Sequence, residues 1–198
     1  MRPVLPHIWQ WSWFSPEKQL DFNGHLLHVG DHRVLVDPPP LSPQEMAEIR
    51  QGGPIDYIVI TNRDHQREAD RYREEFRCRV FAPEADAAAM TMEIDKTFTD
   101  GELLPGGIWV IQLQDQKTPG ESALYLQHQG GIIIVGDAVI GDPPDSLRLL
   151  PPDKYADIEK AKRGLQRLLK YEFTTLLVGD GVCIWREAKS ALQQILQS

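Results

Sequence analysis

Seven polar side chains able to do chemistry follow the ends of predicted strands. They are Asn62, Asp64, Gln66, Arg67, Lys117, Asp137 and Asp180. Their amide and carboxylate oxygens suit a hard ion such as magnesium or calcium. Arg67 and Lys117 instead suit a carboxylate or phosphate ligand and would repel a metal ion. The set therefore permits two opposite chemistries, and Lys117 argues against the metal.

Motifs of other enzyme classes are missing from the sequence. It contains no Gly-rich phosphate loop, no Gly-x-Ser-x-Gly and no Cys-x-x-Cys. Cys78 and Cys183 stand in apolar segments, which favours buried free thiols over a disulfide. Neither cysteine indicates a function.

The first half of the chain has the pattern of a β-meander followed by strand and helix alternation. Trp9, Trp11 and Trp13 alternate at period two and predict a strand whose indoles pack in the core or on a neighbouring strand. A pocket wall or a dimer contact is the alternative for this aromatic face. Asn23-Gly24 is a hairpin-turn signal. Further elements are expected at His25–Val29, Arg33–Val36, Ser42–Gln51 (helix), Ile55–Thr61, Gln66–Cys78 (helix), Val80–Ala82 and Glu84–Met90 (helix).

The second half contains another meander and two helices. Strands are expected at Ile108–Leu113, Ser122–Gln127, Ile132–Val135 and Thr174–Val178, and helices at Asp153–Tyr171 and Trp185–Leu196. Alternation of strand and helix predicts some parallel sheet. The irregular segment Gly141–Asp153 is either a substrate wall or a plain connector. Lys160, Arg163, Arg167 and Lys170 form a basic stripe that we interpret as a solvated helix face.

Composition predicts one ordinary folded domain over residues 1–198. No apolar run is long enough to span a membrane and no signal peptide is recognisable, so we expect a cytoplasmic protein without a membrane partner. The net charge of −8 opposes general nucleic-acid binding, because phosphate contacts need clustered Lys and Arg.

Five strand-end landmarks, taken in order, resemble the metallo-β-lactamase superfamily. They are Val34-Leu35-Val36-Asp37-Pro38, Ile58-Val59-Ile60-Thr61, Lys117-Thr118-Pro119-Gly120-Glu121-Ser122, Ile134-Val135-Gly136-Asp137-Ala138 and Leu177-Val178-Gly179-Asp180-Gly181. The resemblance covers roughly residues 23 to 181. It implies an α+β fold, the four-layer αββα sandwich of that superfamily.

The resemblance also implies a metal site, which this sequence matches poorly. The family carries His-x-His-x-Asp-His after the Thr, then a His, an Asp and a His at later strand ends, and these hold zinc or iron that activates water. When this sequence is aligned with the family pattern without gaps from Thr61 onwards, Asn62, Asp64, Gln66 and Arg67 stand where His, His, Asp and His are expected. Lys117 and Asp180 replace the two later His, and only Asp137 matches. We therefore expect no zinc.

Two alternatives bear on this site. A small gap would align Asp64-His65 with the family's Asp-His pair, but the strand before Thr61 favours the ungapped register, in which His65 is a surface or supporting residue. A hard divalent ion at Asp64, Asp137 and Asp180 is the second alternative.

The replacements predict a network in which positive charge comes from the protein. Burying Asp137 without a counter-charge would be costly, and Lys117 or Arg67 could compensate it. We expect Lys117 and Arg67 to pair with Asp64, Asp137 and Asp180.

Three functions fit such a network. The first is a degenerate, non-catalytic member that binds a small anionic ligand or a partner, with Arg63, Arg67 and Lys117 as anion contacts. The second is a hydrolase of an ester, thioester, lactone or phosphodiester with an altered metal site. The third is a structural homo-oligomer component, for which a homodimer is the simplest form. Fold alone cannot choose among them.

Overall fold

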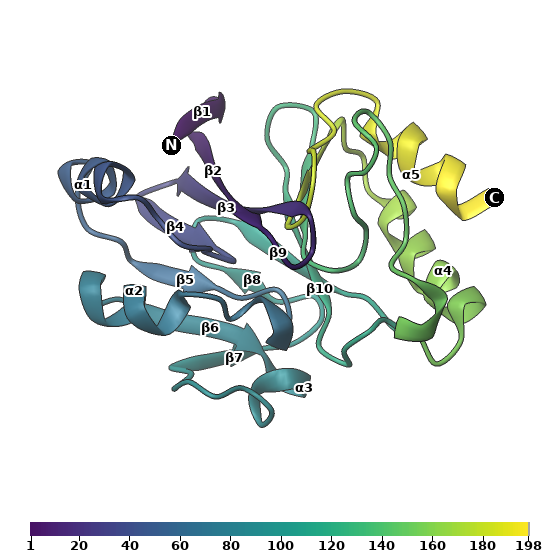
Figure 1. The fold of residues 1–198 in the computed structure, drawn as a ribbon, viewed down its shortest axis with the longest axis horizontal. Coiled ribbons are helices and arrows are strands. Elements are labelled where there is room, and N and C mark those ends of the chain that lie inside the picture. The colour runs from purple at the N-terminus through teal and green to yellow at the C-terminus, as the bar shows by residue number, and fades with distance from the viewer. Residues whose placement is uncertain (198) are drawn as a thin grey trace.

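Two β-sheets stacked face to face form the centre of the computed structural model, which describes residues 1–197 (Figure 1). The seven-stranded sheet follows chain order: β1 (Arg2–Leu5), β2 (Ile8–Ser15), β3 (Leu20–Val29), β4 (His32–Val36), β5 (Tyr57–Val59), β6 (Arg79–Pro83) and β7 (Lys96–Phe98). The five-stranded sheet has the order β12 (Thr175–Val178), β11 (Ile132–Val135), β10 (Ser122–Leu126), β9 (Ile108–Gln112) and β8 (Leu103–Leu104).

Helices cover the outer faces of both sheets. α1 (Pro43–Gln51) and α2 (Ala69–Phe76) lie on the seven-stranded side, and α4 (Ile158–Leu165) and α5 (Ala188–Gln197) lie on the other side (Figure 1). The short helix α3 (Glu84–Ala87) follows β6. Three 3-10 turns complete the set: η1 (Arg63–His65), η2 (Pro152–Lys154) and η3 (Gln166–Lys170). The predicted αββα, α+β architecture is confirmed.

The central strands are apolar on both faces because each sheet packs against something on either side. Leu35, Ile58 and Val80 face the helices α1 and α2, in one hydrophobic cluster with Ile49 and Tyr72. Their alternate neighbours along the same strands belong to a second cluster that spans the two sheets. The strands β4, β5, β6 and β7 are parallel, as are β11 and β12, which confirms the predicted parallel pairing.

α1 begins where its sequence signal places it. Ser42 caps the helix and accepts a hydrogen bond from the Glu45 backbone N–H, while the Glu45 side chain accepts from the Ser42 backbone N–H. Gly52 ends it. The predicted helix Ser42–Gln51 is therefore confirmed.

The hairpin predicted at Asn23-Gly24 is wrong. Both residues lie inside β3, and the turn between β2 and β3 comes earlier, at residues 16–19. Gly24 is opposite Trp11, and a Cβ there would lie 2.4 Å from Trp11 Cζ2 and 2.5 Å from Pro39 Cδ. The glycine is needed because the Trp11 indole packs directly against the backbone there, and not because the chain turns.

The single helix predicted over Asp153–Tyr171 is divided in the structure. Asp157 caps α4, accepting hydrogen bonds from the Glu159 and Lys160 backbone N–H groups, so the regular helix starts there. The 3-10 turns η2 and η3 precede and follow it. The short strands β1, β7 and β8 had no recognisable signal in the sequence.

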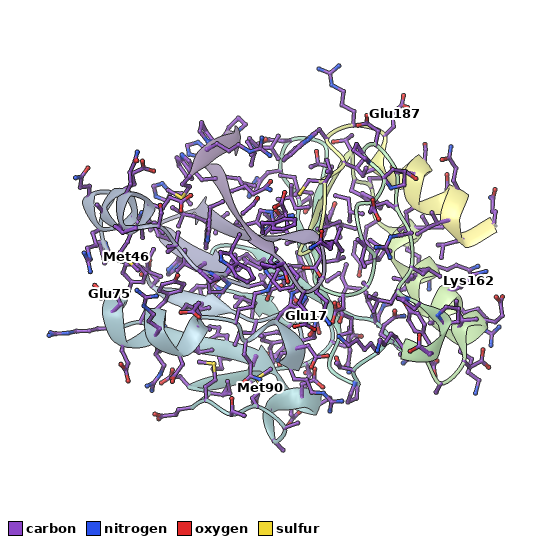
Figure 2. The ribbon with its side chains drawn as sticks, in the orientation of Figure 1. Glu17, Met46, Glu75, Met90, Lys162 and Glu187 are labelled. Atoms are coloured by element: carbon purple, nitrogen blue, oxygen red, sulfur yellow. The ribbon has the colours of Figure 1, made fainter. Side chains whose placement is uncertain are left out.

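The tryptophan stripe of β2 is only partly in the core. Trp11 is buried and its indole N–H donates to the Pro39 carbonyl, but Trp13 is 39% exposed. Cys78 and Cys183 are buried free thiols, as expected. No helix within the described residues is long and apolar enough to cross a membrane. Charged side chains such as Glu75 and Glu187 lie at the periphery (Figure 2).

Candidate functional site

A cavity of about 510 Å³ opens at the edge where the parallel strands of both sheets end. Its lining comprises Lys18, Leu20, Phe22, Asp64, His65, Arg67, Lys117, Asp137, Ile140, Arg148, Leu150, Pro151, Lys154 and Asp180. Five of the seven predicted site residues are among them. The segment Gly141–Asp153 contributes one wall, so it is more than a connector.

Lys117 is placed between two carboxylates on the floor of the cavity. Its ammonium Nζ lies 2.7 Å from Asp137 Oδ2 and 2.9 Å from Asp64 Oδ2. Burial alone would lower the pKa of Lys117, but the two carboxylates outweigh it and raise that pKa. Burial would likewise raise the pKa of Asp137, yet His65 and Lys117 hold it well below its usual range. Both groups are therefore charged and paired.

Beside this pair, the Arg67 side chain connects its own segment to three others, which makes four segments in all. Nη1 donates to the carbonyls of Asn23 (2.7 Å) and Asp37 (2.9 Å). Nη2 donates to the Gly179 carbonyl (3.1 Å) and to Asp180 Oδ1 (2.7 Å). The guanidinium also lies 4.8 Å from the ring centroid of Phe22, a cation–π distance. Burial raises the pKa of Asp180 despite this partner.

His65 lies at the centre of the floor, so of its two interpretations, a surface residue or a supporting residue, the first is wrong. It is 3% exposed; Nδ1 is 2.9 Å from Asp37 Oδ2, and Nε2 is 3.5 Å from Asp137 Oδ1. Asp37 is itself fixed by the Thr61 backbone N–H and hydroxyl. Although burial and the Arg67 cation lower the pKa of His65, Asp37 and Asp137 raise it to about 10. His65 is thus a third internal cation.

Replacing His65 by Gln should remove a pH-dependent part of the stability. A raised folded-state pKa stabilises the fold fully below the ordinary value of about 6.5, and the contribution is lost as pH rises towards about 10. In urea unfolding, the wild-type free energy of unfolding should fall between pH 7 and pH 10. We expect His65→Gln to be less stable at pH 7 and to lack most of that fall. An equal fall in the variant would contradict a charged His65.

Glu121 is a buried acid that the sequence analysis did not predict as a site residue, although it belongs to the landmark that begins at Lys117. It is fully buried, and its Oε1 accepts a hydrogen bond from the Ala138 backbone N–H. Burial and the neighbouring Asp137 raise its pKa well above the usual value, which favours the neutral form of this acid. Apart from Glu121, the floor places the carboxylates of Asp37, Asp64, Asp137 and Asp180 beside the three cations Lys117, Arg67 and His65.

Two predicted site residues, and one predicted anion contact, lie outside the cavity lining. Asn62 is buried and caps η1, accepting from the Asp64 backbone N–H. Gln66 turns away and bonds the Arg63 carbonyl and Thr91. Arg63 does not line the cavity either, and its backbone N–H donates to Asp86. The side chains of Asn62, Gln66 and Arg63 therefore do not form part of the cavity wall.

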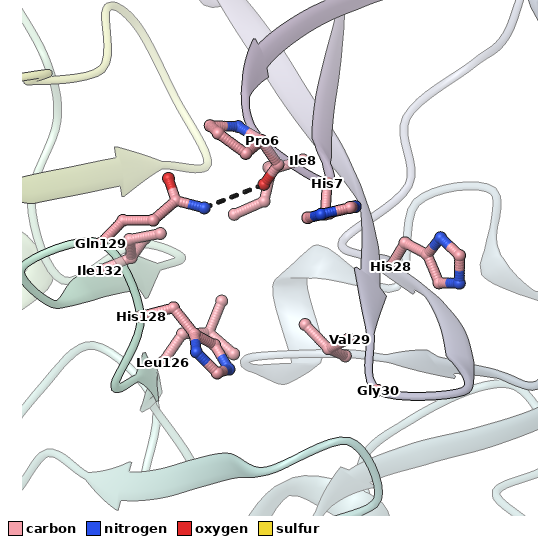
Figure 3. Close-up of a pocket in the computed structure, with 10 residues that line it drawn as sticks. All are labelled: Pro6, His7, Ile8, His28, Val29, Gly30, Leu126, His128, Gln129 and Ile132. Carbon is pink, nitrogen blue, oxygen red and sulfur yellow. Dashed lines mark hydrogen bonds between the residues drawn. The ribbon is translucent and has the colours of Figure 1, made fainter.

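A second cavity, of about 390 Å³, lies at the opposite end of the sheets (Figure 3). His7, His28 and His128 surround an apolar floor that includes Ile8 and Ile132. Among the described residues, these imidazoles do not bring three ligand atoms within 4.8 Å of one another. The described residues that line it include no carboxylate and no Lys or Arg, so the floor built around Lys117 is the better candidate site.

Comparisons with known proteins agree on the fold. The family model described as the metallo-beta-lactamase superfamily matches residues 2–198. No curated protein matches the chain. A metallo-beta-lactamase from Pontibacter korlensis has a TM-score of 0.77 at 17% identity, covering 100% of this chain and 98% of its own. The mono-zinc form of the metallo-beta-lactamase FIM-1 from Pseudomonas aeruginosa has a TM-score of 0.76 at 15% identity, with 98% and 93% covered. A metallo-beta-lactamase family protein from Thermus thermophilus has a TM-score of 0.72 at 16% identity, with 98% and 79% covered.

Proposed function

The chain belongs to the metallo-β-lactamase superfamily, and on that premise we propose that it is a non-catalytic, ligand-binding member. In this proposal its own cations stand where relatives hold metal ions. The cavity above them receives a small organic anion. In this proposal the chain shares its fold with relatives, while the side chains of its site give it a different function.

The position of Lys117 carries the proposal. Its ammonium contacts both Asp64 and Asp137 at hydrogen-bond distance. A divalent ion bound to Asp137 would lie against this positive charge, and Coulomb repulsion at such short range is severe in a partly buried site. Lys117 also gives Asp137 the compensation that a metal would otherwise supply.

The donor set does not fit a resident zinc or iron ion. Zinc sites are built mainly from imidazole and thiolate ligands, and this floor offers one imidazole. Its Nδ1 faces Asp37, its Nε2 faces Asp137, and the paired carboxylates of Asp137 and Asp180 already accept from Lys117 and Arg67. We therefore derive no metal-activated water and no hydrolytic step for this chain.

One observation favours the altered hydrolase as the second candidate. Within the described residues, ligand atoms of His65, Asp137 and Asp180 lie within 4.8 Å of one another. With Lys117 swung away and His65 neutral, these three groups and Asp64 could hold a divalent ion. That candidate requires both changes at once, which makes it the weaker one.

A turnover screen separates the two candidates. Protein supplemented with zinc, manganese or magnesium is assayed against an ester, a lactone, a thioester and a phosphodiester. We expect no turnover above that of Asp137→Ala, because Asp64, Asp137, Asp180 and His65 are already paired with other side chains. Metal-dependent hydrolysis that Asp137→Ala abolishes would replace our proposal with the hydrolase.

A further inference from the structure

The cavity has a mouth and a floor of different electrostatic character. The mouth cations are Lys18, Arg148 and Lys154, whose side chains are 60%, 40% and 50% exposed. On the floor, the side chains of Lys117 and Arg67 are 29% and 7% exposed. The two sets of cations line the same cavity at different depths.

The floor cations have little capacity left for a ligand. Lys117 is shared by two carboxylates, and Arg67 donates to three carbonyls and to Asp180. An anion reaching them would also meet the carboxylates of Asp64 and Asp137. Repulsion from these carboxylates therefore disfavours binding of the anionic group of a ligand at the floor.

The mouth cations are held only weakly by their partners. Lys18 pairs with Glu17, which is 81% exposed, and Lys154 lies 3.7 Å from Asp153, which is 73% exposed. Arg148 pairs with Asp142 through Nε. Exposed pairs of this kind contribute little and exchange readily with another anion. Three such cations around one opening favour a negatively charged group there.

Between mouth and floor the cavity has an apolar wall, formed by Leu20, Phe22, Ile140, Leu150 and Pro151. These side chains come from β3 and from the segment after Asp137. A cavity of this size, with an apolar wall and a few polar groups, is typical of sites for small organic molecules. A bare inorganic anion would leave the wall uncovered.

From these contacts we infer that the ligand is an amphipathic organic anion. Its carboxylate or phosphate lies among the mouth cations, and its alkyl or ring portion lies along the apolar wall above the Lys117 pair. This inference rests on the proposed function and adds the chemical class and orientation of the ligand. It assigns specificity to Lys18, Arg148 and Lys154 rather than to the family's metal-site positions.

Calorimetric titration with simple probes tests both parts of the inference. We expect hexanoate or hexyl phosphate to bind metal-free protein. The probe that binds more tightly shows whether the site prefers a carboxylate or a phosphate head group. Hexanol, which lacks the charge, should bind at least about tenfold more weakly. Octanoate should bind about tenfold more tightly than hexanoate, because each buried methylene adds up to about fourfold. Acetate should not bind measurably.

Two triple variants with the same change in net charge provide the control. Replacing Lys18, Arg148 and Lys154 by Gln should weaken the anionic probe about tenfold and leave hexanol unchanged. Replacing Lys160, Arg163 and Lys170 by Gln, on the exposed α4 and η3 face, should leave both probes unchanged. Thermal unfolding checks that both variants are folded.

Three results would overturn the inference: no binding of either anionic probe, hexanol binding as tightly as hexanoate, or equal weakening by both triple variants. None of them would decide whether the protein is catalytic, which is the other part of the proposed function. The non-catalytic part depends on the absence of metal-dependent turnover, which is measured separately.

Discussion

Lys117→Ala is expected to acquire a site for one divalent ion that the wild-type protein lacks. Removing the ammonium leaves Asp64 and Asp137 without their shared partner and opens the space beside His65 Nε2 and Asp180. His65 must lose its proton to become a ligand, while Nδ1–H still donates to Asp37 and orients the ring. Zinc at about 100 times its dissociation constant would then stabilise the variant by about 2.7 kcal/mol.

Calorimetry and thermal unfolding with and without zinc measure this gain. Without metal, the variant should be less stable than wild type, because Asp137 is left nearly buried beside one fewer cation. The double variant Lys117→Ala/Asp137→Asn should lose the zinc response. Equal zinc binding by wild type and Lys117→Ala would show that the ammonium does not exclude the ion.

Arg67→Met should be the most destabilising single change at the site, by about 3–5 kcal/mol. The substitution keeps an apolar side chain over Phe22 but leaves Asp180 buried without its partner. It also removes the donors for the carbonyls of Asn23, Asp37 and Gly179. Urea unfolding measures the loss, and Arg67→Lys should recover part of it by restoring the charge.

Arg71→Met is the matched control, since this residue lies one turn further along, in α2. Its side chain is 62% exposed, and its contact with Glu68 is 3.4 Å. We expect a change of less than about 1 kcal/mol. Similar losses for the two variants would mean that Arg67 does not connect the four segments energetically.

The fold could be predicted from the sequence because its signals are local and mutually consistent. The Ser42 and Glu45 capping box fixed the start of α1, and apolar runs marked the strands that are buried on both faces. Asn23-Gly24 misled because a turn signal and a glycine packed beneath Trp11 look the same in sequence. Elements without apolar periodicity, such as β7 and β8, were missed for lack of any signal.

The candidate site was only partly predictable, since sequence position does not give side-chain direction. Lys117, Asp64 and Asp137 were expected together, and the structure brings them within hydrogen-bond distance. Gln66 holds a ligand position in the family pattern but turns towards Thr91. His65 was expected to be a surface or supporting residue in the ungapped register, and the 3-10 turn after Asn62 directs its ring to Asp37. The orientation of the His65 ring depends on Asp37, a buried carboxylate that follows β4 and is distant in the sequence.

If the floor cations replace the metal as we propose, similarity of fold does not predict the activity of this chain. Solved structures that share this fold at 14–18% identity include enzymes described as metallo-beta-lactamases. In our proposal the sheets are retained, while Lys117 and Arg67 occupy two positions that carry metal ligands in relatives. Substitution at a few strand ends would then change the chemistry of the site without disturbing the sheets that position these side chains.

Metal content of the wild-type protein tests the central claim most directly. The protein is purified without chelator, incubated with excess zinc at neutral pH, desalted, and measured by elemental analysis against its concentration. Our account predicts well below one zinc, iron or manganese per chain, because Lys117, Arg67 and His65 already compensate the carboxylates. About one tightly held metal ion per chain would contradict it.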